Sequence, residues 1–192
     1  MFKLLGFTLL AYLIGSFPTG YLLARLKGVN IFERGSGNIG ATNVWRTLGP
    51  LYGTLAFIGD VGKGALATYL GMRLGPTAAV LTGAAALVGH AFSVFLRFRG
   101  GKMVATALGV FLLLAPKATL GALAVWIFVF ALGRYVSLAS IIAAGSLPIL
   151  TYALRYPRGI CIFSFLAALV VILRHRDNIR RLLEGKEHRF GR

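Results

Sequence analysis

The chain has 192 residues, of which 57% are hydrophobic and 14% are charged, and its net charge is +16. Soluble domains carry about 25% charged residues, so the composition excludes an ordinary soluble protein and favours one polytopic membrane domain over residues 1–192. The positive charge then indicates contacts with anionic membrane lipids, and we expect no nucleic-acid partner.

Seven apolar segments follow one another along the chain, and each predicts a membrane-spanning helix of roughly 20 residues or fewer. The fourth and fifth are short and are separated only by Pro116 and Lys117, so half-helices or one bent element are alternatives. The predicted fold is an all-α integral membrane protein, a bundle of about seven transmembrane helices. The predicted spans cover residues 4–24, 51–72, 77–96, 104–115, 119–132, 137–153 and 159–173.

The distribution of basic residues predicts the orientation of this bundle. If the N-terminus lies outside, the inner segments hold fifteen basic residues and the outer segments hold five. Basic residues concentrate on the cytoplasmic side of membrane proteins. We therefore expect the N-terminus outside and the C-terminus in the cytoplasm.

Three polar segments interrupt the apolar chain, and the predicted topology places all of them on the cytoplasmic side. The first polar segment covers residues 35–46, the second covers 97–106 and the third covers 174–187. Each combines glycine, small hydroxyl or amide side chains and fixed cations. This combination suits an anionic ligand that carries phosphate.

The first polar segment has the composition of an anion-binding loop. Its glycines allow successive backbone N–H groups to point at one anion, and Arg46 adds a forked cation suited to phosphate. A polar connector between helices is the alternative interpretation. The glycines are Gly35, Gly37 and Gly40, and the neutral polar side chains are Ser36, Asn38, Thr42 and Asn43.

In the second polar segment, Gly100, Gly101 and Lys102 directly precede a helix that is predicted to start near Val104. Backbone amides at a helix N-terminus together with a lysine form an anion site. A basic cytoplasmic turn would have the same sequence, so the pattern alone leaves both interpretations open.

The third polar segment is predicted to form an interfacial helix after the last span. Basic residues here and just beyond, namely Arg176, Arg180 and Arg189, suit contacts with lipid head groups. His175 and Asn178 lie three residues apart and share one helix face, and lipid contact explains them less well. They are therefore candidates for catalysis.

Ionisable residues also lie inside two predicted spans. Asp60 and Lys63 are three residues apart, so they either neutralise each other or serve function, with Lys63 contacting substrate. His90 lies in the next span, where a single histidine is more often a hydrogen-bonded structural residue. The histidines are far apart and the chain has a single cysteine, Cys161, so we expect no metal and no other cofactor.

The motifs, in this order, resemble the bacterial acyl-phosphate:glycerol-3-phosphate acyltransferases of the PlsY family. They are Gly-Ser-Gly-Asn-x-Gly-x-Thr-Asn at 35–43, Asp-x-x-Lys-Gly at 60–64, Gly-His at 89–90, Phe-Arg-Gly-Gly-Lys at 98–102, Ala-Thr at 105–106 and His-Arg-x-Asn-Ile-x-Arg-Leu-Leu-x-Gly-x-Glu at 175–187. The resemblance covers nearly the whole chain. One departure is Met103, where the family usually has a glycine, and it puts the shape of the loop in question.

The resemblance implies transfer of a fatty acyl group from acyl phosphate to the 1-hydroxyl of glycerol 3-phosphate, at the cytoplasmic face of the bacterial inner membrane. The products would be lysophosphatidic acid and phosphate, in the first step of phospholipid synthesis. The implied catalytic residues are His175, Asn178, Ser36, Arg46 and Lys102. The implied substrate-binding residues are Ser36, Asn38, Thr42, Asn43, Arg46, Lys63, His90, Gly100, Gly101, Lys102 and Thr106. Asp60 and Glu187 would be supporting residues, with Glu187 holding the tail in place.

The sequence contains neither a His-Asp dyad of acyltransferase spacing nor a nucleophile elbow. Because acyl phosphate is already activated, we expect direct acyl transfer, in which a substrate phosphate oxygen accepts the proton and cations stabilise developing charge. His175 as the general base is the alternative.

Two other functions compete with this one. A transporter of a phosphorylated metabolite would use midplane charges such as Asp60 and Lys63, but it predicts an internal repeat, and the sequence shows none. A lipid-binding scaffold predicts scattered basic residues without ordered polar segments.

Overall fold

The computed structural model describes residues 2–191, which form α-helices and short 3-10 helices without a β-strand. Contacts divide the chain into two compact units, Met1–Leu114 and Ala115–Arg192, and each is described by itself. The first unit contains α1 (Phe2–Ser16), α2 (Thr19–Leu26), η1 (Ile31–Glu33), α3 (Ala41–Leu48), α4 (Pro50–Met72), α5 (Pro76–Ala91), η2 (Val94–Leu96) and α6 (Val104–Leu114). The second contains α7 (Pro116–Gly133), α8 (Val136–Ala153), α9 (Arg158–Arg174) and α10 (Arg176–Leu183).

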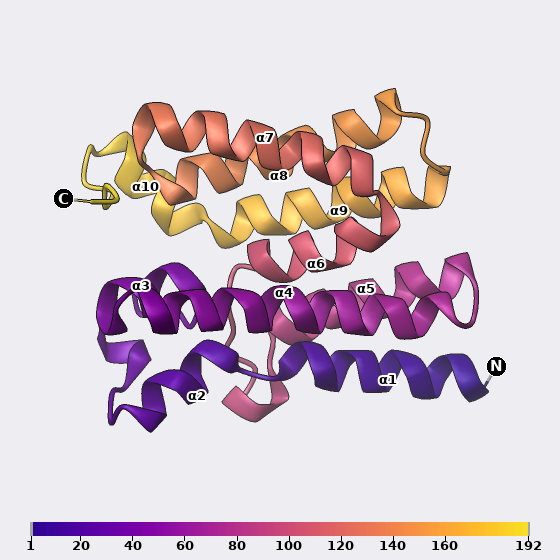
Figure 1. Cartoon of the computed structure of the whole chain (residues 1–192), viewed down its shortest axis with the longest axis horizontal. Helices are drawn as coiled ribbons and strands as arrows, with labels where there is room; N and C mark the ends of the chain where they lie inside the picture. Colours follow the sequence, from indigo (N-terminus) through magenta and orange to yellow (C-terminus); the bar gives the residue numbers. More distant parts are fainter. Residues whose placement is uncertain (1, 192) are drawn as a thin grey trace. The chain divides into compact units, whose positions relative to one another are not determined.

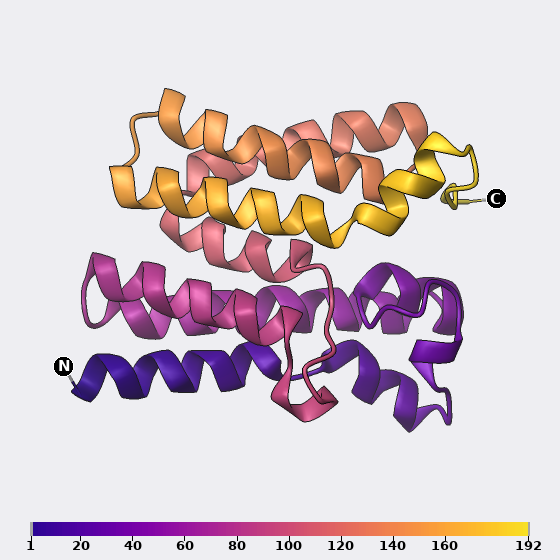
Figure 2. The ribbon, with the colours of Figure 1, turned by 180° about the vertical axis from the view of Figure 1, so that it is seen from behind.

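In the first unit, α5 packs against α1 and α4, and α4 also packs against α6 (Figures 1 and 2). Small residues allow these backbones to approach closely, as is common between helices in lipid. A Cβ atom on Gly15 of α1 would collide with the backbone of Ala86 in α5. A Cβ atom on Gly64 of α4 would likewise collide with the backbone of Thr106 in α6.

The first predicted span is interrupted near its C-terminal end. The span predicted over residues 4–24 lies within Phe2–Leu26, a segment long and apolar enough to cross a membrane. Its helix is not continuous, because α1 ends at Ser16 and α2 begins at Thr19. Pro18 lies at the break, has no backbone N–H and disfavours helical geometry at Phe17. At this break the carbonyl oxygen of Phe17 accepts hydrogen bonds from Thr19 N at 3.2 Å and from a side chain of another helix.

In the second unit, α8 packs against both α7 and α9 (Figure 1). The chain then bends by 57° between α9 and α10. The C-terminal tail returns to the turn between α7 and α8, where Phe190 N donates a hydrogen bond of 2.8 Å to Arg134 O. The Phe190 ring also meets the Phe130 ring edge-on, so the tail is fixed at two points.

Among the described residues, three helical segments are long and apolar enough to cross a membrane, or four if the bent pair α9–α10 is one span. The three are Phe2–Leu26, Pro116–Gly133 and Val136–Ala153. The predicted span 77–96 was too long, since α5 ends at Ala91. The fourth and fifth predicted spans form two helices, α6 and α7. The count of seven spans and the orientation stay predictions.

Candidate active site

Asn43, buried in the first turn of α3, organises the first polar segment from within. Its amide nitrogen donates hydrogen bonds to Asn38 O at 2.8 Å and Arg34 O at 3.0 Å. Its amide oxygen accepts from Ser36 N at 2.9 Å. Gly35 has a φ of +56°, and a Cβ there would meet the same amide oxygen. Asn43 thus uses its side chain to shape the loop.

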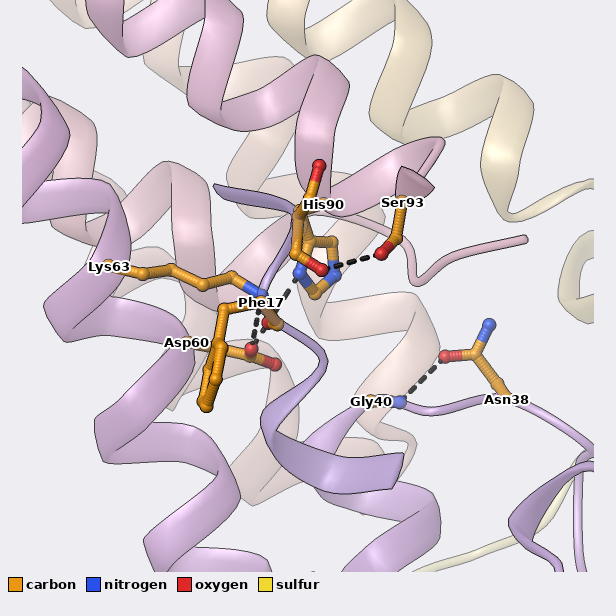
Figure 3. Close-up of polar contacts among 8 residues, drawn as sticks. Phe17, Asn38, Gly40, Asp60, Lys63, His90 and Ser93 are labelled. Atoms are coloured by element: carbon orange, nitrogen blue, oxygen red, sulfur yellow. Dashed lines mark hydrogen bonds and ion pairs between the residues drawn. The ribbon is translucent and has the colours of Figure 1, made fainter. Parts of the chain in front are cut away.

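The other polar residues of this segment lie nearer the surface. Asn38 accepts a hydrogen bond of 2.9 Å from Gly40 N through its side-chain oxygen (Figure 3). Thr42 is half-buried in the first turn of α3, whereas Ser36 in the loop and Arg46 in the last turn of α3 are exposed. The hydroxyl of Ser36 and the guanidinium of Arg46 are therefore accessible to a ligand.

One apolar cluster brings the first and second polar segments together in the first unit. It contains Ile39 and Val44 of the first segment and Leu96, the residue before the second segment. The Arg99 guanidinium also lies 5.8 Å from the centre of the Phe32 ring, close to the start of the first segment. The fold therefore places two of the predicted phosphate-binding segments next to each other.

We expect Asn43→Ala to destabilise the protein and lower activity, because a buried amide that closes the loop would be lost. Leaving its buried partners unpaired costs about 1–3 kcal/mol. The unfolding temperature in detergent measures this loss. Asn30→Ala is the matched control, since Asn30 makes an exposed side-chain contact with Glu33. Equal unfolding temperatures for Asn43→Ala and wild type would contradict the loop-closing role.

The second polar segment is a loop closed on Ser93. Ser93 N donates to Arg99 O at 3.3 Å, and Phe98 N donates to Ser93 O at 2.8 Å. The buried Ser93 hydroxyl donates to Ser16 O at the end of α1. Farther along, Gly101 N donates to His90 O at 3.0 Å. These bonds hold the Gly100–Gly101–Lys102 backbone against α5 and the end of α1.

Met103 ends this loop in the left-handed region, with a φ of +68°, and its side chain is buried. A residue with a Cβ pays roughly 1–2 kcal/mol for this conformation, whereas glycine does not. The methionine thus keeps a glycine-like backbone, and burial of its side chain offsets part of the cost. Thr106, in the first turn of α6, is also buried.

The ionisable residues inside the predicted spans contact one another. The Lys63 ammonium lies 2.7 Å from an Asp60 carboxylate oxygen and donates to Phe17 O at 2.9 Å (Figure 3). His90 Nδ1 lies 3.7 Å from the same carboxylate oxygen. Of the two interpretations of Asp60 and Lys63, mutual neutralisation fits this geometry. Phe17 O and Ser93 were not identified from the sequence, because only tertiary packing places them here.

The third polar segment holds His175 and Asn178, both buried. His175 lies between α9 and α10, and its Nδ1 is 2.8 Å from Val171 O. A carbonyl only accepts hydrogen bonds, so Nδ1 carries the hydrogen and Nε2 is the basic nitrogen of the neutral ring. Asn178 donates to Glu187 at 2.8 Å, so its amide nitrogen faces the carboxylate and its amide oxygen faces away.

Glu187 joins the C-terminal tail to the rest of the second unit. Besides Asn178, its carboxylate accepts hydrogen bonds from Ser137 at 3.0 Å and from Arg181 at 2.8 Å. Burial opposes the charged form, but the three hydrogen bonds and the charge of Arg181 outweigh it and lower the pKa of Glu187. Nearby, Arg189 donates a hydrogen bond of 3.2 Å to Gly133 O. Arg189 therefore stabilises the fold, and the predicted lipid contact is not its sole role.

The lowered pKa of Glu187 predicts a loss of stability in acid. Its contribution is fully present above the ordinary glutamate pKa, about 4.3, and is lost as the pH falls through the lower folded-state value. We expect Glu187→Gln to cost about 1–3 kcal/mol at pH 7 and less near pH 4. Unfolding temperatures of both proteins across this range measure the difference. If the difference in unfolding temperature between wild type and Glu187→Gln is as large near pH 4 as at pH 7, this prediction is wrong.

No group of three or more His, Cys, Asp or Glu residues arranged to hold a metal ion occurs within residues 2–191. The three polar segments present glycine-rich loops, amides, hydroxyls and cations, and these groups suit an anionic ligand.

Comparison with known proteins agrees with this chemistry. Residues 5–185 match the family model described as glycerol-3-phosphate acyltransferase. The chain belongs to this family. A glycerol-3-phosphate acyltransferase of Desulforudis audaxviator is 58% identical over 188 residues, which cover 95% of this chain and 93% of the relative. One of Aquifex aeolicus is 44% identical and covers 98% of this chain and 100% of the relative.

Two solved structures are also similar to this acyltransferase. Both are crystal structures of PlsY (YgiH), described as an integral membrane glycerol 3-phosphate acyltransferase, and both are 43% identical over 98% of this chain and 96% of theirs. The glycerol 3-phosphate form has a TM-score of 0.95, and the lysophosphatidic acid form has one of 0.92. The chain is thus an all-helical integral membrane acyltransferase that acts on glycerol 3-phosphate.

Proposed function

We propose that this acyltransferase uses acyl phosphate as its donor and acylates the 1-hydroxyl of glycerol 3-phosphate. The products are lysophosphatidic acid and inorganic phosphate. One observation supports the acceptor and the product: a PlsY relative has a crystal structure described as the glycerol 3-phosphate form, with a TM-score of 0.95, and another described as the lysophosphatidic acid form, with a TM-score of 0.92. The glycine-rich, cationic segments of this chain suit a donor and an acceptor that both carry phosphate.

The proposed site residues divide by chemistry. Ser36 and Arg46, exposed on the first polar segment, bind a substrate phosphate. Gly100, Gly101 and Lys102 bind the acyl-phosphate end through backbone N–H groups and the ammonium. His175 and Asn178 act at the reacting groups. Supporting binding contacts are proposed for Asn38, Thr42, Asn43 and Thr106. Lys63 and His90 are proposed to support substrate binding from behind the second polar segment.

The transfer needs no covalent enzyme intermediate. The glycerol hydroxyl oxygen attacks the acyl carbonyl carbon, a new ester C–O bond forms, and the C–O bond to phosphate breaks. The hydroxyl proton passes to a substrate phosphate oxygen, and inorganic phosphate leaves. Fixed cations stabilise the charge that develops on the carbonyl and phosphate oxygens.

We place the enzyme in the bacterial cytoplasmic membrane, with residues 1–192 acting as one functional domain. The N-terminus lies outside, and the C-terminus and the three polar segments lie in the cytoplasm. The soluble substrate reaches the site from the cytoplasm, while the acyl chain lies among apolar helices and the product leaves into the inner leaflet. The enzyme is therefore surrounded by membrane lipids, and its product is itself a lipid.

A product assay tests the donor directly. Purified protein in detergent is incubated with glycerol 3-phosphate and either palmitoyl phosphate, palmitoyl-CoA or free palmitate. We expect lysophosphatidic acid and an equal amount of phosphate with palmitoyl phosphate only. Arg180→Gln, which removes an exposed ion pair with Glu184, is the control and keeps this activity. Product from palmitoyl-CoA but not from palmitoyl phosphate would overturn the proposal.

Transport of a phosphorylated metabolite fits less well. It would use Asp60 and Lys63 as midplane binding charges, but these two side chains pair with each other at 2.7 Å. Uptake of glycerol 3-phosphate into vesicles without acyl phosphate would favour transport instead.

A further inference from the structure

A buried charged cluster lies behind the second polar segment. It consists of Asp60 and Lys63 of α4 and His90 of α5, each at least 93% buried. A buried ion pair that loses one partner is strongly destabilising, whereas a satisfied one fixes geometry. Here the carboxylate lies between the ammonium at 2.7 Å and His90 Nδ1 at 3.7 Å. The ion pair of the cluster therefore lies beside the Nδ1 edge of the imidazole.

His90 connects this cluster to the loop. Its backbone oxygen accepts the hydrogen bond from Gly101 N at 3.0 Å. Its ring lies against Gly101, so that a Cβ atom there would collide with Nε2. One edge of the ring thus faces the Asp60 carboxylate and the other faces the Gly101 backbone. Any rotation of the ring changes the space available to the loop.

The cluster and the loop are also fixed to the same point of the chain. Lys63 donates to Phe17 O at the break between α1 and α2. Ser93, which closes the loop, donates to the neighbouring carbonyl of Ser16. Two neighbouring carbonyl oxygens at this break, Ser16 O and Phe17 O, therefore hold the base of the loop and the cation of the cluster respectively.

We propose that Asp60, Lys63 and His90 are positioning residues that set the conformation of the Gly100–Gly101–Lys102 backbone for the phosphate of the acyl donor. The inference rests on the proposed function and deepens it. Lys63 acts through Asp60 and Phe17, and His90 acts through Gly101. The cluster holds the donor loop in its binding conformation before substrate arrives, so its loss weakens donor binding and leaves acceptor binding unchanged.

Steady-state kinetics of two His90 variants test this role. His90→Leu keeps the volume and removes both ring nitrogens, whereas His90→Asn keeps a donor near the position of Nδ1. We expect His90→Leu to raise the KM for palmitoyl phosphate about tenfold, with the KM for glycerol 3-phosphate within about twofold. We expect His90→Asn to recover most of the loss. His188→Leu, at an exposed histidine, is the matched control and leaves both values unchanged.

A double-mutant cycle tests the contact between the His90 ring and Gly101. Its conclusion rests on the comparison of several variants, so it does not depend on the behaviour of any single one. Gly101→Ala should raise the donor KM about tenfold in the wild type, because its Cβ meets the His90 ring. In the His90→Ala background the ring is gone, so the same change should raise the donor KM less than about threefold. Multiplicative effects of the two substitutions would overturn the inference.

Three results would decide against the cluster as a positioning device. They are an equal rise of both KM values in His90→Leu, a fall in kcat with both KM values unchanged, and failure of His90→Asn to improve on His90→Leu. If the wild type makes no product from palmitoyl phosphate, the proposed donor is wrong. If the wild type makes product from palmitoyl phosphate but any of these three contrary results is obtained, the proposed donor is correct and the positioning role of the cluster is wrong.

Discussion

Arg46→Lys is expected to lower kcat/KM for glycerol 3-phosphate about 30- to 100-fold, although it keeps the positive charge. A guanidinium can form two parallel hydrogen bonds to one phosphate, and an ammonium cannot. Loss of one hydrogen bond to a charged group costs about 1.5–3 kcal/mol, or roughly 10- to 150-fold in rate, and the expected loss lies within this range. Arg46 is exposed on α3, so it is accessible to the substrate.

Arg25→Lys is the matched control, because Arg25 is also an exposed arginine in the last turn of a helix of the first unit. We expect it to retain nearly full activity. Kinetics of Arg46→Lys that match wild type would show that Arg46 contributes only charge for membrane topology.

His175→Ala is expected to lower kcat about 100-fold without changing the shape of the pH profile. If a substrate phosphate accepts the proton, any inflection near pH 6 belongs to the phosphate, whose second pKa is about 6, and persists in the variant. The histidine then contributes by positioning. The rate measured from pH 5.5 to 8.5 with saturating substrates distinguishes the two roles.

The alternative is chemically reasonable, because the bond between Nδ1 and Val171 O leaves Nε2 as the basic nitrogen. In that case the inflection in the wild-type pH profile would belong to the histidine and would disappear in His175→Ala. His188→Ala, at an exposed histidine, controls for nonspecific loss of charge.

Apolar segment length predicted the helices well, since every predicted span contains a helix. It did not predict how they end. Residues 92–96 are mostly apolar, so hydropathy extended the third span to 96, whereas Ser93 folds this stretch back into a closed loop. The break after Ser16 was also missed, although Pro18 is visible in the sequence, because apolar composition alone does not register a missing N–H.

The sequence predicted those contacts of the site that join residues three or four apart on the same helix. Asp60 and Lys63 are three residues apart, and they pair. The contribution of Asn43 was not predictable, because the same amide can bind a ligand or shape a loop, and only tertiary geometry distinguishes them. The contacts of His90 with Asp60 and Gly101 likewise join residues from three separate segments.

Membrane topology is the most direct test of the central claim, that the three polar segments serve one acyl transfer at the cytoplasmic face. Single cysteines are placed at Ser36, Arg99 and His188, all exposed, in a Cys161→Ala background. A membrane-impermeant thiol reagent should label none of them in intact cells and all of them in inverted vesicles, whereas a cysteine at Arg158 should behave oppositely. Labelling of any of the three polar positions from outside would contradict the account.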